Sequence, residues 1–154
     1  MSDVSAGAEG FIGKRSLGFL IRRAHKLISQ QAEQVFKGRD LTLSQWIALK
    51  IVDEGRAVRA GEVARLLGHD AGAVTRLIDQ LESQGLLDRR REIGDRRQVS
   101  LALTPAGKSM AKAWDGEVVG FFDELLAAFS PAEVEAMISL MGRLVDRLEA
   151  REAS

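Results

Sequence analysis

The feature that most constrains the fold is a change in the spacing of apolar residues at Gly85. Up to that glycine, apolar side chains recur every three or four positions, which is the spacing of amphipathic helices. Two short helices are predicted here, within residues 60–68 and 69–85. Gly68 is placed to end the first and Asp70 to cap the second. The sequence therefore predicts a pair of helices joined by a tight turn.

Beyond this glycine the pattern becomes that of a β-strand. In residues 98–103 apolar side chains alternate with polar or small ones, which is strand periodicity. Residues 86–91, LLDRRR, can form the opposing strand, with Gly94 and Asp95 as the turn. A helix pair followed by a hairpin predicts a mostly α fold with a small β-hairpin, a winged helix-turn-helix.

Helical spacing also appears on both sides of this region. It predicts helices over residues 14–37, from 42 to about 53, from 104 to 129 and from 130 to 148. TLSQ (42–45) and SPAE (130–133) fit capping boxes, in which the first and fourth side chains bond each other's backbone N–H groups. Thr104 before Pro105 is a further helix start.

The composition excludes several classes of function. The chain has no cysteine, which excludes disulfides, thiol-based redox sensing and a cysteine nucleophile. It contains no nucleophile elbow, phosphate loop or zinc-type spacing of ligands. No apolar run approaches the roughly 18 residues of a membrane span, and the N-terminus has no export signal. We therefore expect a soluble cytoplasmic protein that is not an enzyme, with no catalytic residue, metal, cofactor or membrane partner.

The charge is zero overall but unevenly distributed. Residues 1–55 and 56–97 each carry +2, whereas residues 98–154 carry −4. Arginines gather in the hairpin, where Asp95 can orient Arg97, and where Arg96 and Arg97 are expected at a narrow tip. Guanidinium groups suit the minor groove of DNA because a narrow groove concentrates negative potential. The alternative interpretation is that an arginine-rich hairpin is merely a solvated surface.

Further arginines lie on the first strand of the hairpin. Period two places Arg89 and Arg91 on one face and Arg90 on the other. Some are expected to reach phosphates and others to be structural. We take Arg89 and Arg91 as candidate DNA contacts.

The second helix of the pair is the candidate recognition helix. Its buried stripe is Val74, Leu77, Ile78 and Leu81, which leaves several side chains facing outward. Thr75 and Arg76 are the best candidates for base-edge or phosphate contacts. The remaining candidates are Ala71 and Ala73, which can touch thymine methyls, and Gln80. Gly72 either permits close backbone approach or is simply tolerated.

Phosphates can also be bound outside the recognition helix. Ser44 and Gln45 lie at a helix N-terminus, where backbone N–H groups favour anions. Arg59 and Arg65 flank the first helix of the pair. For each of these four, a solvated surface group is the alternative.

The terminal helices carry more apolar surface than a small winged helix can cover. Each large side chain contributes roughly 1.5–3 kcal/mol when buried, so pairing with a second copy is the expected solution. A bundle within a monomer is the alternative. The candidate dimer residues are Leu17, Leu20, Phe122, Leu125, Ile138, Met141, Leu144, Val145 and Leu148. The predicted organisation is a flexible arm (1–13), a dimerisation region (14–40 and 104–150) and a DNA-binding region (41–103).

Three residues are candidates for a small-molecule site. His25 falls on the apolar side of the first helix, where a buried imidazole can line a pocket with Phe36 and Trp46 as aromatic walls. The alternatives are that His25 is an interface residue and that Trp46, like Trp114, belongs to the core.

The chain resembles the MarR family of winged helix-turn-helix regulators. The resemblance runs from about Arg15 to Leu148 and is most specific in VTRLIDQLESQGLLDRR (74–90) and DRRQVSLALTPAG (95–107), supported by LTLSQWIAL (41–49) and EVARLLG (62–68). It implies a homodimer that places recognition helices in successive major grooves of a near-palindromic double-stranded DNA site, with wings in the flanking minor grooves. It also implies release from DNA by a small aromatic or phenolic ligand.

The sequence departs from the family pattern in one place. The recognition helix begins with Ala71-Gly72-Ala73, where relatives often have serine, threonine or a basic residue. Direct base readout is therefore expected to be weaker, with more specificity from the wing and from DNA shape. The leading hypothesis is a transcriptional regulator that acts as a repressor, and the alternative is a winged-helix protein-interaction module that does not bind DNA.

Overall fold

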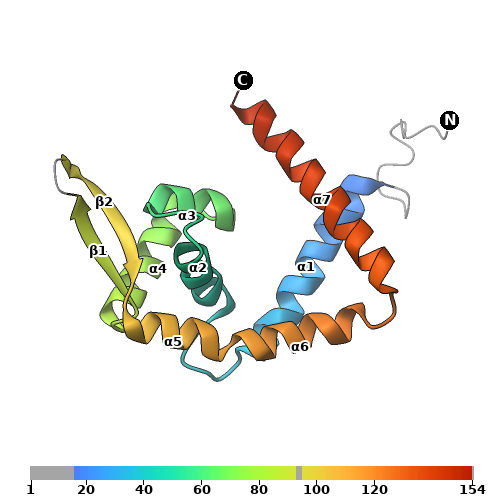
Figure 1. Cartoon of the computed structure of the whole chain (residues 1–154), viewed down its shortest axis with the longest axis horizontal. Helices are drawn as coiled ribbons and strands as arrows, with labels where there is room; N and C mark the ends of the chain where they lie inside the picture. The colour runs from blue at the N-terminus through green and yellow to red at the C-terminus, as the bar shows by residue number, and fades with distance from the viewer. Residues whose placement is uncertain (1–15, 93–94, 154) are drawn as a thin grey trace. The chain divides into compact units, whose positions relative to one another are not determined.

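The computed structural model describes residues 16–92 and 95–153, with the backbone alone for residues 92 and 95–98. The elements in chain order are α1 (Leu17–Val35), α2 (Leu43–Asp53), α3 (Ala60–Leu67), α4 (Ala71–Ser83), β1 (Leu87–Glu92), β2 (Asp95–Leu103), α5 (Pro105–Ala113), α6 (Asp115–Leu126) and α7 (Pro131–Glu152) (Figure 1). They form two compact units, Met1–Gly116 and Glu117–Ser154. The predicted fold class, mostly helical with one antiparallel hairpin, is confirmed.

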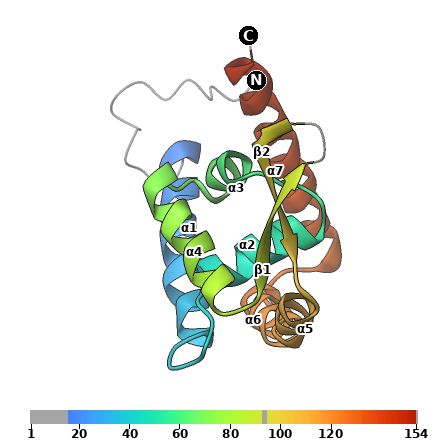
Figure 2. The ribbon, with the colours of Figure 1, turned by 90° about the vertical axis from the view of Figure 1, so that its left-hand side faces the viewer.

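The core of the first unit lies among α2, α3, α4, the hairpin and α5 (Figure 2). The predicted stripe of α4 is buried throughout, and the largest fully buried side chains come from several elements: Leu41, Leu49, Val63, Val74, Ile78, Leu81 and Leu87. Each such side chain stabilises the unit by roughly 1.5–3 kcal/mol. The recognition helix is therefore held by the core along its whole buried face.

The helix ends follow the predicted capping chemistry. Thr42 and Gln45 form the capping box of α2, and Ser130 and Glu133 form that of α7. The Asp70 side chain accepts from the Ala73 N–H at 2.8 Å at the start of α4. At its other end, α4 has Gln84 as its C-cap, with Gly85 following at φ 71°, one residue beyond the expected cap. A glycine suits that place because left-handed backbone costs it little.

The hairpin pairs β1 with β2 in an antiparallel register. Arg89 lies opposite Leu101, Arg91 opposite Val99 and Arg90 opposite Ser100, so Arg89 and Arg91 share one face as predicted. Asp95 is the first residue of β2 and pairs with Glu92 rather than forming part of the turn. Gly94, the other half of the predicted turn, lies outside the described residues.

One backbone bond fastens the hairpin to the helical part of the unit. The Leu101 N–H donates to the Val58 carbonyl, in the loop between α2 and α3, at 2.7 Å. The base of the wing is therefore attached to the core, since α2 and α3 both pack in it.

The helix predicted from 104 to 129 is divided into two. α5 ends at its C-cap Trp114 and α6 begins at Asp115. Trp114 is buried, with its ring stacked on Phe36 at a centroid distance of 4.6 Å, and Asp115 pairs with Lys50 of α2 at 3.2 Å. These long-range contacts, followed by Gly116, which has low helix propensity, account for the break.

The second unit is dominated by α7. The apolar side chains of α7 are mostly exposed in the described chain, and no residue of α7 is buried. Among the described residues, no single helix is long and apolar enough to cross a membrane; segments 105–126 and 131–152 reach that length and composition only jointly, across a bend of 108°.

Gly107 lies at the closest approach between α5 and the start of the hairpin. A Cβ atom there would lie 1.9 Å from the Leu86 carbonyl oxygen. That same carbonyl accepts from the Thr104 N–H at 3.1 Å, and the Thr104 hydroxyl donates to the Gly85 carbonyl at 2.6 Å. The glycine of the LTPAG segment is therefore required by packing.

We predict that Gly107→Ala lowers the free energy of unfolding by at least about 2 kcal/mol, because the added methyl group displaces backbone rather than a flexible side chain. Gly116→Ala is the matched control: its Cβ meets open space, and a helical alanine stabilises by up to about 1 kcal/mol over glycine. Urea denaturation measures both. Equal effects of the two substitutions would contradict the packing role of Gly107.

Candidate nucleic-acid interface

The outward face of α4 is the centre of the candidate interface. Ala71, Gly72, Thr75 and Arg76 are exposed and Ala73 is half-buried, opposite the apolar stripe that holds the helix to the core. Figure 2 shows α4 and the hairpin on the same side of the first unit. The candidate base contacts of α4 therefore lie beside the arginine-bearing strand.

The first turn of α4 is ordered by its own side chains. The Thr75 hydroxyl donates to the Ala71 carbonyl at 2.8 Å, so its lone pairs face outward as acceptors. The backbone hydrogen bond from Ala73, together with the nearby charge of Arg76, holds the pKa of Asp70 below its usual value. The cap of α4 therefore stays ionised through the neutral range.

Gly72 has a defined environment in this turn. A Cβ at this position would lie 3.2 Å from Asp70 Oδ1 and 3.7 Å from Arg76 Nη1. The absent side chain thus leaves space in which the Arg76 guanidinium can approach the Asp70 carboxylate.

Two of the residues predicted to contact phosphates or bases, Gln45 and Gln80, form hydrogen bonds within the protein. Gln45 is buried: its Oε1 accepts from the Thr42 N–H at 3.0 Å, and its Nε2 donates to Gln80 Oε1 at 3.3 Å. The carbonyl end of Gln80 is therefore turned toward α2. This pairing joins residues 35 positions apart, which local periodicity does not reveal.

The other candidates at helix starts are more accessible. Ser44 is half-buried, and its hydroxyl lies 3.3 Å from His69 Nε2, in the turn between α3 and α4. Sequence reasoning did not single out His69, whose only signal is its place next to the Asp70 cap. Arg59, the N-cap of α3, and Arg65 within it are exposed. The Glu62 carboxylate accepts from the Val58 and Arg59 N–H groups at 2.9 and 3.0 Å, which lowers the pKa of Glu62.

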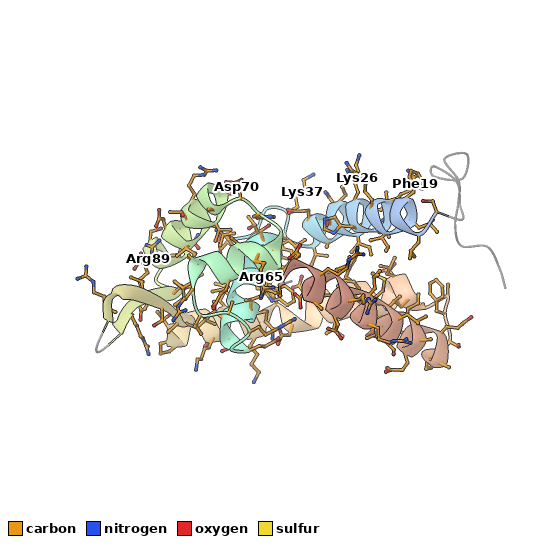
Figure 3. All side chains as sticks on the ribbon, turned by 90° about the horizontal axis from the view of Figure 1, so that it is seen from above. Phe19, Lys26, Lys37, Arg65, Asp70 and Arg89 are labelled. Atoms are coloured by element: carbon orange, nitrogen blue, oxygen red, sulfur yellow. The ribbon has the colours of Figure 1, made fainter. Side chains whose placement is uncertain are left out.

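Arg89 is bound within the protein. Its Nη2 lies 2.5 Å from Asp79 Oδ1 and its Nη1 bonds Glu82 Oε2, so one guanidinium joins β1 to two carboxylates of α4. Arg89 is labelled in Figure 3. The hydrogen bond to Asp79, and then the charge of Glu82, raise the pKa of Arg89. Arg90 and Arg91 are exposed. Asp95, Arg96 and Arg97 lie outside the residues whose side chains the structure describes.

The three candidate ligand residues do not form one site in the described structure. Phe36 is buried and lies 6.3 Å from the Trp46 ring, whose Nε1–H donates to the Ala111 carbonyl at 3.1 Å. Trp46 and Trp114 therefore belong to an aromatic core, the alternative considered from the sequence. His25 is exposed in the single chain, which is also the state expected of the alternative, an interface residue.

The described residues were also considered for a further small-molecule hollow and for a metal site. An open hollow of about 150 Å³ beside α1 is lined by Phe19, Arg22, Arg23 and Lys26, a set that sequence reasoning did not single out. Across residues 16–92 and 95–153, no group of three or more histidine or acidic side chains could hold a metal ion.

Two helices joined by a tight turn and followed by an arginine-bearing hairpin define a winged helix-turn-helix. The comparison with known proteins agrees: a sequence model described as "MarR family" matches residues 39–98. The HTH-type transcriptional regulators YcgE and YdgJ of Bacillus subtilis are 29% and 30% identical over 99 and 96 residues, 64% and 62% of this chain. The match spans 64% of the length of YcgE and 58% of the length of YdgJ.

Solved structures match over more of the chain. A mutant MarR of E. coli is 25% identical with a TM-score of 0.71, covering 84% of this chain and 96% of that one. BpsR of Bordetella bronchiseptica, solved in a study of how 6-hydroxynicotinic acid regulates its DNA binding, is 25% identical with a TM-score of 0.73, covering 84% and 93%. MepR of S. aureus, solved with DNA, shares the fold at 22% identity and a TM-score of 0.69, covering 85% and 96%.

The chain is similar to MarR family regulators in sequence over residues 39–98 and in fold over most of its length.

Proposed function

We propose that this protein binds double-stranded DNA sequence-specifically as a MarR-type transcriptional regulator. The observation that carries the proposal is the arrangement of α4: it buries Val74, Leu77, Ile78 and Leu81 and exposes Thr75 and Arg76 beside the hairpin. A helix held by its apolar face and open on its polar face can enter a major groove. The solved complex of MepR with DNA supports the same use of this fold.

The proposed contacts divide by groove. Ala71, Ala73, Thr75 and Arg76 face base edges or phosphates in the major groove, and Arg96 and Arg97, oriented by Asp95, enter the minor groove. Ser44, Arg59, Arg65 and Arg91 contact phosphates, which positions the protein without reading sequence. The internal bonding of Gln45 and Gln80 makes both weaker candidates.

The protein is proposed to act as a homodimer on a near-palindromic site. Exposed apolar side chains occur on each of α1, α6 and α7: Leu17, Leu20, Phe122, Leu125, Ile138, Met141, Val145 and Leu148. Ile138 is 62% exposed and Leu17 is 56% exposed, which is costly in water and favours association. Residues 14–40 and 104–150 form this dimerisation region, with Leu144 half-buried in it, and residues 41–103 form the DNA-binding region.

Regulation is proposed to be repression, relieved by a small aromatic or phenolic ligand. The support is the study of BpsR and 6-hydroxynicotinic acid. The aromatic core of Phe36, Trp46 and Trp114 joins α5 to the end of α1, so a ligand that disturbs this core can move the DNA-binding region.

We predict that Arg97→Ala weakens DNA binding at least about tenfold, since loss of a minor-groove guanidinium removes a charge-assisted contact. The salt dependence should also become shallower by about one unit for each phosphate charge that is no longer neutralised. A band-shift titration at two or more salt concentrations measures both. Arg151→Ala, at the end of α7, is the matched control for loss of one positive charge. An unchanged titration for Arg97→Ala would refute the wing assignment.

We predict that Ile138→Glu weakens the dimer at least about a hundredfold, because it places an unpaired carboxylate in an apolar interface. Light scattering should give twice the 16.8 kDa chain mass for the unaltered protein and a lower mass for the variant. Ser139→Glu, on the adjacent position of α7, controls for the added charge. An unaltered protein that is monomeric at all concentrations would overturn the dimer.

Hydroxylated aromatic acids are expected to release the protein from its DNA, because a ligand bound at the dimerisation region shifts the population toward a conformation with lower DNA affinity. Fluorescence anisotropy of labelled operator DNA, titrated with a panel of such acids, measures release, and tryptophan fluorescence reports binding near Trp46 and Trp114. Benzoate analogues without the hydroxyl group serve as controls. Binding without release would contradict ligand-relieved repression.

A further inference from the structure

The recognition helix carries two carboxylates on its exposed side. Asp79 lies four residues after Thr75 and three after Arg76, so it shares their exposed side of the helix. The side chains of Asp79 and Glu82 are 56% and 40% exposed. Unpaired carboxylates in this position would repel the phosphates of an approaching duplex. Something must offset them if α4 is to lie in a groove.

Arg89 is the cation placed to offset them. Its planar guanidinium donates from two nitrogens to two carboxylates, one from Asp79 and one from Glu82. Arginine can do this because its donors form a rigid fork, whereas a lysine ammonium is a point charge. Arg89 projects from the face of β1 that also carries Leu87, which is buried. Its donors are therefore directed toward α4.

The ion pairs of Arg89 with Asp79 and Glu82 also cross-link the hairpin to α4 and fix its direction. The backbone hydrogen bond from Leu101 to Val58 holds the base of the hairpin. Arg89 lies opposite Leu101 in the register, so its ion pairs attach the same part of the hairpin to α4. A strand rises about 3.3 Å per residue, so a small tilt at this level moves the hairpin tip by several times as much. The cross-link thus determines where residues 95–97 lie relative to the recognition helix.

We propose that Arg89 is a positioning residue of the DNA-binding surface, which neutralises Asp79 and Glu82 and holds the wing against α4, rather than a residue that contacts DNA. This revises its assignment from the sequence and rests on the proposed DNA-binding function. Arg91, two residues along the strand and exposed, keeps the role of a direct phosphate contact.

A double-mutant cycle tests the proposal. Arg89→Gln is made in the native sequence and in the Asp79→Asn, Glu82→Gln background, and affinity for operator DNA is measured in each. We expect a loss of about tenfold in the native sequence and a change within about twofold in the neutralised background, because the effect acts through the two carboxylates. Arg91→Gln, the matched control, should weaken binding by the same factor in both backgrounds.

Three outcomes would overturn the proposal. If Arg89→Gln lowered affinity by one factor in both backgrounds, Arg89 would be a direct contact. If it left affinity unchanged in the native sequence, Arg89 would have no role in binding. If its loss of affinity were matched by a loss of folded protein in thermal denaturation, the role would be one of stability alone.

Hydrogen exchange separates this proposal from the function on which it rests. In the free protein, Arg89→Gln should speed amide exchange in residues 87–91 and 99–103 while leaving α2 protected, and Arg91→Gln should not. If the unaltered protein bound no DNA even at low salt, the proposed function would fail while this measurement still reported on the cross-link. Unchanged exchange in the hairpin would overturn the cross-link itself.

Discussion

The structure depends on the close packing at Gly85 and Leu86, where α4 ends, the hairpin begins and α5 returns to the core. The Gly85 and Leu86 carbonyls accept from the side chain and backbone of Thr104, and Gly107 has no side chain because the Leu86 carbonyl occupies its place. The recognition helix, the wing and the helix leading to the second unit are thereby joined through one short segment. A displacement at this segment would move all three.

The position of each charged side chain matters more for this surface than the net charge of the protein. The net charge is zero, yet the arginines of the DNA-binding region have different partners. Arg76 lies beside the Asp70 cap, Arg89 is bound by Asp79 and Glu82, and Arg91 is exposed. Because a guanidinium bonded to carboxylates offers less net charge to a phosphate than an exposed one, a count of arginines overstates the basic character of this surface.

The sequence predicted the fold more fully than the site. The buried stripe of α4, the four N-caps and the shared face of Arg89 and Arg91 all depend on neighbours within a few residues, and these predictions are confirmed. The break at Trp114 was missed because it depends on a stack with Phe36, far away in the sequence. The internal roles of Gln45 and Gln80 were missed for the same reason.

The amino-acid sequence alone determined the class of fold, because apolar periodicity, capping residues and turn residues act locally and leave a readable pattern. The tertiary structure decided which polar side chains remain available to a partner. Whether Arg89 faces a phosphate or two carboxylates depends on how close β1 lies to α4, and that distance is set by packing among residues widely separated along the chain.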